Sequence, residues 1–196
     1  MSLGSETSSE SVAHAMRRAS IGGASLLQQT GTYNDGVVEG LPHDLCAVDP
    51  AQFQRRVGEV IGSSDWMLID QDMVNKFADA TGDHQFIHIN EEMAKMTPFG
   101  GTIAHGFLSL SLLPVLMAKS TCPRIEGVKM GVNYGGNKTR FLAPVRVGKR
   151  VRGHFKLLEL AEKRPGQWQQ TIEYTLEIEG EDKPALMAEW ITQFFV

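Results

Sequence analysis

The sequence has 196 residues, a length expected for one domain with an additional segment. Its hydrophobic fraction of 42% and charged fraction of 21% are those of an ordinary globular protein. The net charge of -4 and the pI near 5.9 give no electrostatic basis for binding nucleic acid or an anionic membrane. The longest strongly apolar stretch, residues 107–118, contains a proline and is too short to span a bilayer.

The cysteines and the N-terminus favour a cytoplasmic protein. Cys46 and Cys122 are too few for a disulfide framework or a cysteine metal site, so we expect two unpaired thiols in a reducing compartment. The N-terminus lacks the hydrophobic region of a signal peptide and contains Glu6 and Glu10.

Residues 1–50 differ in composition from the remainder of the chain. They are rich in Ser, Gly and Thr and show no sustained hydrophobic periodicity. We therefore expect an N-terminal extension that is partly disordered or lies on the surface of a domain formed by residues 51–196. Deleting residues 1–48 is then expected to leave the fold largely intact.

The first elements of the domain are expected to be short. Residues 51–60 have the pattern of a short amphipathic helix, and residues 66–69 that of a short strand. Asp70 is a suitable N-cap for a helix over residues 71–81, and Gly82 is a suitable residue to follow its last turn.

The middle of the chain combines a polar loop with a buried helix. A loop is expected over residues 83–89, followed by a short helix over residues 91–96 that Asn90 caps. Residues 105–119 are almost wholly apolar, which predicts a buried helix with a kink at Pro114.

The C-terminal part of the chain has the pattern of a β-meander. Alternating apolar residues and turn-forming tripeptides at residues 164–166 and 180–182 predict hairpins. A buried helix followed by an antiparallel meander indicates an α+β fold. The expected strands cover residues 128–134, 138–142, 150–162, 167–179 and 185–196.

The most informative stretch is residues 77–117, FADATGDHQFIHINEEMAKMTPFGGTIAHGFLSLSLLPVLM. Asp83 stands five residues before His88, and a glycine-rich turn leads to His105-Gly106 at the start of the apolar helix. This stretch resembles the MaoC-like dehydratase family, the hot-dog-fold (R)-specific enoyl-CoA hydratases, whose pattern is ATGD-x-N-P-x-H-x-D followed by FG-x-x-I-A-H-G. The resemblance runs from about Val57 to the C-terminus.

The resemblance is greatest to the branch related to nodulation protein N, in which Gln-aromatic-Ile-His replaces Asn-Pro-x-His. It implies a hot-dog fold, in which an antiparallel sheet wraps around a long central helix. It also implies a homodimer or higher homo-oligomer, with active sites at or near the subunit interface.

Taken alone, an Asp/His pair is more often a loop cap and a satisfied histidine than a catalytic pair. The resemblance instead implies that Asp83 and His88 hold a water that adds to C3 of a trans-2-enoyl thioester while a proton reaches C2. It implies that the backbone N–H of Gly106 binds the thioester oxygen, whereas the alternative role of this glycine is helix packing. Gln85 stands where the family has Asn and is a candidate for positioning the water. His105 is expected to be structural or a supporting hydrogen-bond partner.

Residues 133–141 also resemble the branch related to nodulation protein N. A strand with a bulge at the double glycine explains most of them. The candidates for contacts at the entrance of the site and with the CoA phosphates are Tyr134, Asn137, Lys138 and Arg140.

The sequence therefore predicts a hydratase/dehydratase that acts on a 2-enoyl-CoA. We expect this enzyme to need no metal and no cofactor beyond CoA as part of the substrate. We also expect neither a nucleic-acid partner nor a membrane span. Two alternatives stay open: an acyl-CoA thioesterase, in which water attacks the thioester carbonyl, and a non-catalytic acyl-binding protein. Fold alone does not decide among them.

Overall fold

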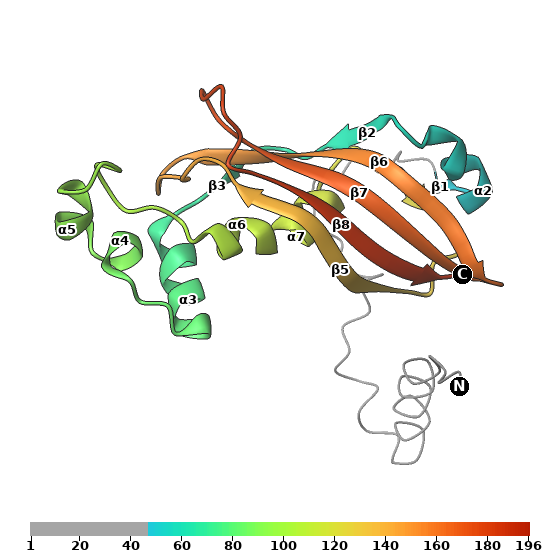
Figure 1. The fold of residues 1–196 in the computed structure, drawn as a ribbon, viewed down its shortest axis with the longest axis horizontal. Helices are drawn as coiled ribbons and strands as arrows, with labels where there is room; N and C mark the ends of the chain where they lie inside the picture. Colours follow the sequence, from blue (N-terminus) through green and yellow to red (C-terminus); the bar gives the residue numbers. More distant parts are fainter. Residues whose placement is uncertain (1–46) are drawn as a thin grey trace, which may run out of the picture. The chain divides into compact units, whose positions relative to one another are not determined.

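The structure, a computed structural model, describes residues 47–196 (Figure 1). Residues 1–46, which include most of the predicted extension and Cys46, lie outside the described part. The first described elements are β1 (Ala47–Val48), α2 (Pro50–Phe53), a 3-10 turn (Gln54–Arg56), β2 (Val60–Ser63) and β3 (Met67–Leu68). The helices that follow are α3 (Gln71–Thr81), α4 (Phe86–Ile89), α5 (Glu91–Lys95), α6 (Gly106–Ser111) and α7 (Leu113–Ala118). The remaining strands are β4 (Arg124–Ile125), β5 (Met130–Phe141), β6 (Arg150–Arg164), β7 (Gln167–Ile178) and β8 (Leu186–Phe195).

One antiparallel sheet dominates the described part of the chain. Its strand order is β2-β6-β7-β8-β5, and β3 also pairs with β6. The hairpins between β6 and β7 and between β7 and β8 contain Gly166 and Gly180, each with a φ of 74°. The sheet curves around α6 and α7 (Figure 1), which confirms the predicted α+β hot-dog fold.

The core lies between the sheet and the two central helices. The buried side chains of β6, β7 and β8 alternate with partly exposed ones, as expected for a sheet with one covered face. Gly153 on β6 allows a close approach, because a Cβ there would lie only 3.3 Å from Cβ of Leu116 on α7. The largest fully buried side chains are Tyr174, Phe155, Ile69, Leu116, Leu157, Ile172, Leu176, Ile178 and Leu186.

Local capping explains why α3 has the predicted limits. The Asp70 Oδ1 atom accepts a hydrogen bond from the backbone N–H of Met73, at 2.8 Å. At the other end, Gly82 has a φ of 78° and donates its N–H to the carbonyl oxygen of Ala78, at 2.8 Å. These two ends place Asp83 directly beyond the helix.

The buried helix is two helices instead of one kinked helix. It is interrupted at Leu112 between α6 and α7, and Pro114 lies in the first turn of α7. Proline has no N–H to donate to the carbonyl four residues earlier, which explains the break. None of the helices within residues 47–196 has the length and apolar character needed to cross a bilayer.

Three other predicted elements are corrected by the structure. The helix predicted over residues 51–60 is only α2 with a 3-10 turn, and its last residue, Val60, begins β2. The loop predicted over residues 83–89 contains the short helix α4. The two strands predicted on either side of Gly135-Gly136 form the single strand β5, because β8 continues to pair with it across the glycines. The ladder shifts register between Asn133 and Gly135, as predicted for a bulge in this region.

Candidate active site

Asp83 stands in the turn that follows α3. Its Oδ1 atom accepts a hydrogen bond from the backbone N–H of Gln85, 3.3 Å away, and this bond shapes the loop. The Asp83 side chain is 55% exposed, and its Oδ2 atom lies 4.0 Å from Nε2 of His105. The carboxylate is therefore open to solvent on one side and faces an imidazole on the other.

His88 lies on α4 and is only 6% exposed. Its Nδ1 atom is 2.7 Å from the carbonyl oxygen of Ile103. A carbonyl oxygen can only accept, so Nδ1 carries the proton and Nε2 holds a lone pair. Burial lowers the pKa of His88 below its ordinary value of 6.5, although the bond to Ile103 acts in the opposite direction. His88 is thus neutral at neutral pH and can accept a proton at Nε2.

A polar network fixes the position of α4. Gln71 on α3 donates from Nε2 to the backbone carbonyl of His88, and its Oε1 accepts from the Thr102 hydroxyl, both at 2.7 Å. Glu91 Oε2 accepts from the backbone N–H of Thr102 at 3.1 Å and shares the single Thr102 hydroxyl proton with Gln71 Oε1, also at 3.1 Å from the hydroxyl oxygen. These bonds hold the pKa of Glu91 below its ordinary value. The orientation of His88 is consequently set by α3, α5 and the segment before α6.

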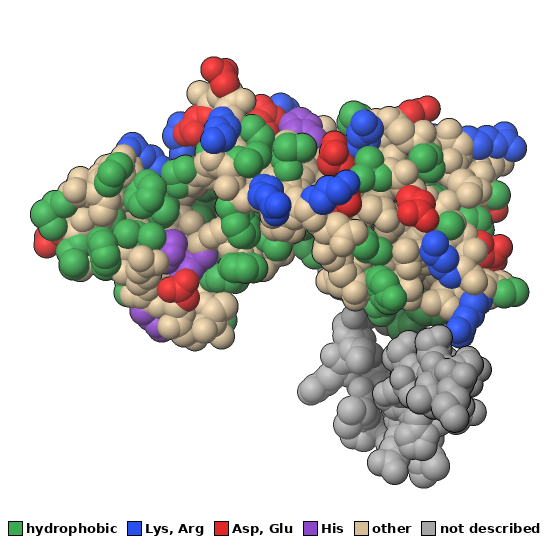
Figure 2. All heavy atoms as spheres, in the orientation of Figure 1, with side chains coloured by type: hydrophobic (Ala, Val, Ile, Leu, Met, Phe, Trp, Pro, Cys, Tyr) green, Lys and Arg blue, Asp and Glu red, His purple; other side chains and the backbone are tan. Residues whose placement is uncertain are grey.

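His105, the residue before α6, lies against His88. The ring centroids are 3.7 Å apart and the ring planes differ by 26°. His105 Nε2 lies 2.9 Å from the backbone carbonyl oxygen of Asp83. Histidine and acidic side chains lie together in the region of α3 and α6, with apolar side chains around them (Figure 2).

Asp83, His88 and His105 each offer one polar atom within 4.8 Å of the others, and these residue types also bind metals. Their geometry does not fit a metal ion. One nitrogen of each ring already donates to a carbonyl. A metal ion in the plane of one ring would also lie out of the plane of the ring stacked on it. The arrangement suits proton transfer better than coordination.

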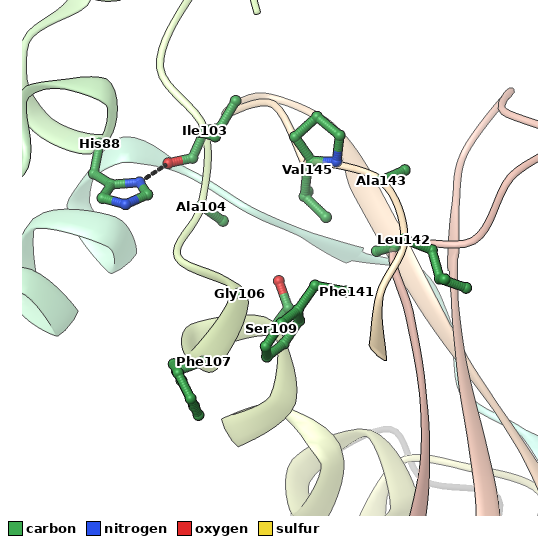
Figure 3. Close-up of a pocket in the computed structure, with 12 residues that line it drawn as sticks. His88, Ile103, Ala104, Gly106, Phe107, Ser109, Phe141, Leu142, Ala143 and Val145 are labelled. Atoms are coloured by element: carbon green, nitrogen blue, oxygen red, sulfur yellow. Dashed lines mark hydrogen bonds between the residues drawn. The ribbon is translucent and has the colours of Figure 1, made fainter. Parts of the chain in front are cut away.

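A pocket of about 410 Å³ opens beside His88 and Gly106 (Figure 3). Gly106 is the first residue of α6, so its backbone N–H has no partner within the helix. A Cβ at this position would lie 2.9 Å from the Phe141 ring, so both the packing role and the substrate-binding role of this glycine are compatible with the structure. The pocket is mainly apolar and is lined by His88, Ile103, Ala104, Gly106, Phe107, Ser109, Phe141, Leu142, Ala143, Pro144, Val145 and Ala185.

The structure brings Asp83 and His88 together, and it places His88 and Gly106 on the pocket wall. Gln85 is exposed immediately before α4. The four candidates for CoA contacts are exposed on β5: Tyr134, Asn137, Lys138 and Arg140. Lys138 is paired with Glu189 at 2.6 Å, and the Arg140 guanidinium donates to the neighbouring backbone carbonyl of Thr139.

Sequence reasoning missed most of the pocket wall. Phe107 and Ser109 come from α6, Phe141 is the last residue of β5, residues 142–145 follow it, and Ala185 precedes β8. The Ser109 hydroxyl donates to the backbone carbonyl of His105 at 3.4 Å and lies on the pocket wall. The available signal was the apolar run of the helix, which predicts burial without showing which strand end packs against it.

The family model described as "MaoC like domain" matches residues 52–180, the part of the chain that carries the helices, the pocket and most of the sheet. The chain belongs to the MaoC-like domain family.

Members of this family that are similar to the chain include curated bacterial proteins. Nodulation protein N of Rhizobium leguminosarum bv. viciae is 48% identical over 151 residues, which cover 76% of this chain and 91% of that protein. 3-Hydroxyacyl-thioester dehydratase Z of Mycobacterium tuberculosis (strain ATCC 25618 / H37Rv) is 49% identical over 144 residues, covering 74% and 94%. These homologues include enzymes that are lyases acting on carbon–oxygen bonds.

Solved MaoC-like structures share the fold at lower identity. The (R)-hydratase from A. caviae involved in PHA biosynthesis superposes with a TM-score of 0.56 and 24% identity, covering 68% of this chain and 95% of that one. The monoamine oxidase regulatory protein from Archaeoglobus fulgius gives a TM-score of 0.64 at 22% identity, covering 76% and 95%. This similarity confirms the hot-dog architecture.

Proposed function

We propose that the protein is a 3-hydroxyacyl-thioester dehydratase that also catalyses the reverse reaction, the hydration of a trans-2-enoyl-CoA. The observation that carries this proposal is the pairing of Asp83 with a neutral, buried His88 at the edge of an apolar pocket. The similarity to 3-hydroxyacyl-thioester dehydratase Z supports the same reaction class.

In the hydration direction, Asp83 and His88 hold one water between them. His88 Nε2 has the free lone pair and accepts a proton as the water oxygen forms a bond to C3 of the substrate. The electrons of the C2=C3 double bond move toward the thioester carbonyl, and C2 then takes a proton from the dyad. The dyad thus receives one proton from the water and delivers one proton to C2, so each turnover returns it to its starting protonation state.

The start of α6 supplies the electrostatic part of the reaction. As the water adds, negative charge develops on the thioester oxygen. The Gly106 N–H, which has no partner within the helix, would donate a hydrogen bond to that oxygen. Dehydration reverses these steps, with the 3-hydroxyl leaving as water after a proton has been removed from C2.

The pocket provides a place for the acyl chain. Its volume of about 410 Å³ lies within the range of roughly 300–1,000 Å³ that is usual for small-molecule sites. Phe107 and Phe141 both line it, with their ring centroids 5.4 Å apart (Figure 3). Gln85 is the candidate for positioning the water. Tyr134, Asn137, Lys138 and Arg140 are the candidates for contacts with the CoA moiety, on the strand that leads to Phe141.

The direct test is to incubate the protein with crotonyl-CoA and with longer 2-enoyl-CoAs. Loss of the enoyl absorbance and release of free thiol are followed in parallel. Hydration without thiol release is the expected result. Thiol release without hydration would replace the proposal with a thioesterase, and binding of acyl-CoA without turnover would favour an acyl-binding protein. The Asp83→Asn protein serves as the control for contaminating hydratase.

We also propose that the protein forms at least a homodimer. Among the strands of residues 47–196, β5 lies at an edge of the sheet, and it exposes Met130, Val132 and Tyr134, with Tyr134 63% exposed. An uncovered apolar edge of this kind favours association with another strand or chain. Sedimentation at micromolar concentration should give about twice 21.6 kDa or a higher multiple. An active species at the monomer mass would contradict the proposal.

A further inference from the structure

His105 is a buried histidine that contacts both members of the proposed dyad. It is 3% exposed. Its Nε2 atom lies 2.9 Å from the carbonyl oxygen of Asp83, so this nitrogen carries the proton and donates it. Its ring stacks on that of His88 at 3.7 Å, and Phe77 on α3 packs against the ring at 5.0 Å. His105 itself is not part of the pocket wall.

The position of His105 in the chain makes these contacts significant. It immediately precedes Gly106, so the residue that supports the dyad is joined to the proposed thioester-binding N–H by one peptide bond. Three separate segments, the loop of Asp83, helix α4 with His88, and the start of α6, therefore meet at one side chain.

The second nitrogen of the ring indicates that packing alone does not explain this residue. Within residues 47–196, His105 Nδ1 is a buried atom without a hydrogen-bond partner. A buried polar atom without a partner costs free energy that an apolar side chain of similar size would avoid. This cost is explained if the ring is retained because its Nε2–H binds the Asp83 carbonyl and its face contacts the ring of His88.

We infer that His105 is a positioning residue that aligns Asp83 and His88 with each other and with Gly106. This inference rests on the proposed function. The Nε2–H of His105 holds the Asp83 backbone so that the carboxylate faces the imidazole of His88. The face of the ring holds His88 with its Nε2 available for proton transfer.

Stacking also affects the charge of His88. The titratable groups that face His88 are His105 on its ring face and the Asp83 carboxylate. Two imidazoles at 3.7 Å repel each other when both are protonated, so His105 adds to the lowering of the His88 pKa that burial causes. Asp83 acts in the opposite direction. His105 thereby supports the neutral state in which His88 can accept a proton.

Two substitutions separate the contributions of the hydrogen bond and the ring. His105→Phe keeps an aromatic ring against His88 but removes the donor to Asp83. His105→Gln keeps an amide N–H at the place of Nε2 but removes the stacked ring. We expect kcat for enoyl-CoA hydration to fall on the order of 10–100-fold in His105→Phe, with KM changed by less than about threefold, because misplacing a catalytic group lowers the rate of the chemical step.

In both variants the pKa of His88 should rise, because neither replacement side chain can carry a positive charge against its ring. The acid limb of the pH–rate profile should therefore move to higher pH in both, and kcat at neutral pH should be retained better in His105→Gln, which keeps the donor to Asp83, than in His105→Phe. A purely structural role would lower the amount of folded protein without moving this limb. His84→Gln is the matched control, because His84 is an exposed histidine on the same loop and its Nε2 pairs with Asp79 at 2.9 Å.

A second measurement is independent of turnover. Nitrogen-15 NMR of the imidazoles should show His88 protonated at Nδ1 in the wild type and titrating at higher pH in His105→Gln. If wild type shows no hydration, the proposed function fails, but the titration still tests the contact between the two rings. If wild type is active and both folded variants keep its kcat, pH profile and His88 titration, the positioning role is wrong. If one variant does not fold, the other decides by the same criteria.

Discussion

The Nδ1 atom of His88 donates to the carbonyl oxygen of Ile103 over 2.7 Å, and this one bond determines the tautomer of the buried imidazole. Ile103 belongs to the segment that leads into α6 and is itself a residue of the pocket wall. The strand-like pairing of Ile103 with Arg146 fixes the backbone from which the carbonyl projects. The chemistry of His88 is thus set by a backbone group fifteen residues away.

The first prediction concerns pH. Burial lowers the pKa of His88 below 6.5, so the residue should stay neutral as the pH falls through the ordinary histidine range. For His84 the sign is opposite, because its hydrogen bond to the Asp79 carboxylate raises its pKa above 6.5. As the pH is lowered in an NMR titration, His84 should therefore be protonated first and His88 at a lower pH. Hydration should decline on the acid side only below 6.5, and the reverse order of titration would contradict the assigned environment of His88.

The second prediction concerns the dyad. Asp83→Asn and His88→Gln preserve side-chain size but remove proton transfer, so each should reduce enoyl-CoA hydration on the order of 10²–10⁴-fold with little change in circular dichroism. Because the two groups are proposed to share one water, the double mutant should lose much less than the product of the two single effects. His84→Gln should retain wild-type rates. Wild-type rates in both dyad variants would exclude the assignment.

The third prediction concerns Cys122, which is 5% exposed. Burial raises the pKa of the Cys122 thiol to about 11, although a hydrogen bond with Ser120 acts against this. The reactive thiolate is therefore scarce and inaccessible at neutral pH. In a Cys46→Ser background, a thiol reagent should modify Cys122 only after denaturant is added. Rapid modification of the folded protein would show that this part of the core opens readily.

Elements governed by local chemistry could be predicted from the sequence. The limits of α3 follow from Asp70 and Gly82, whose capping roles involve only neighbouring residues. The hairpin turns likewise depend on glycines with positive φ, Gly166 and Gly180. The resemblance to the family motif predicted that Asp83 and His88 act as a pair. Local sequence could not have done so, because these side chains meet only after α3 and α4 have packed.

Features that depend on distant segments could not be predicted. The sequence Gly135-Gly136 predicts a break between two strands. In the structure β5 continues through both glycines, because they pair with Ile191 and Trp190 of β8. The pocket wall combines α6, the end of β5 with the residues after it, and the residue before β8, which no local periodicity connects. The contact of His105 with the Asp83 carbonyl is also tertiary, since the atoms belong to residues 22 positions apart.

The fourth prediction refines the N-terminal boundary. The sequence suggested that residues 1–48 could be removed, but Ala47–Val48 forms β1, pairs with Arg124–Ile125 and places Val48 against the core. Deleting residues 1–46 should leave stability and hydration largely unchanged. Deleting residues 1–48 should cost about 1–2 kcal/mol, a fall of roughly 2–8 °C in Tm. Thermal unfolding of the two truncated proteins tests this boundary, and equal Tm values would show that β1 contributes nothing.

The fifth prediction concerns the contact between Gly106 and Phe141. In Gly106→Ala, the new Cβ would lie 2.9 Å from the Phe141 ring, so the ring must move. Phe141 is 47% exposed, so its displacement should cost little stability. It also lines the pocket beside the proposed thioester-binding N–H, so kcat/KM should fall on the order of 10-fold or more.

Adding Phe141→Leu to Gly106→Ala relieves the steric conflict and should restore part of the lost rate, whereas Phe141→Leu alone should have a smaller effect. Gly131→Ala is the matched control, because a Cβ at Gly131 would have no atom of residues 47–196 within 4 Å. Steady-state kinetics and thermal unfolding of these four variants, each compared with wild type, separate the effect on the site from an effect on folding. If Gly106→Ala hydrates at the wild-type rate, close approach to this helix N-terminus is not part of the reaction.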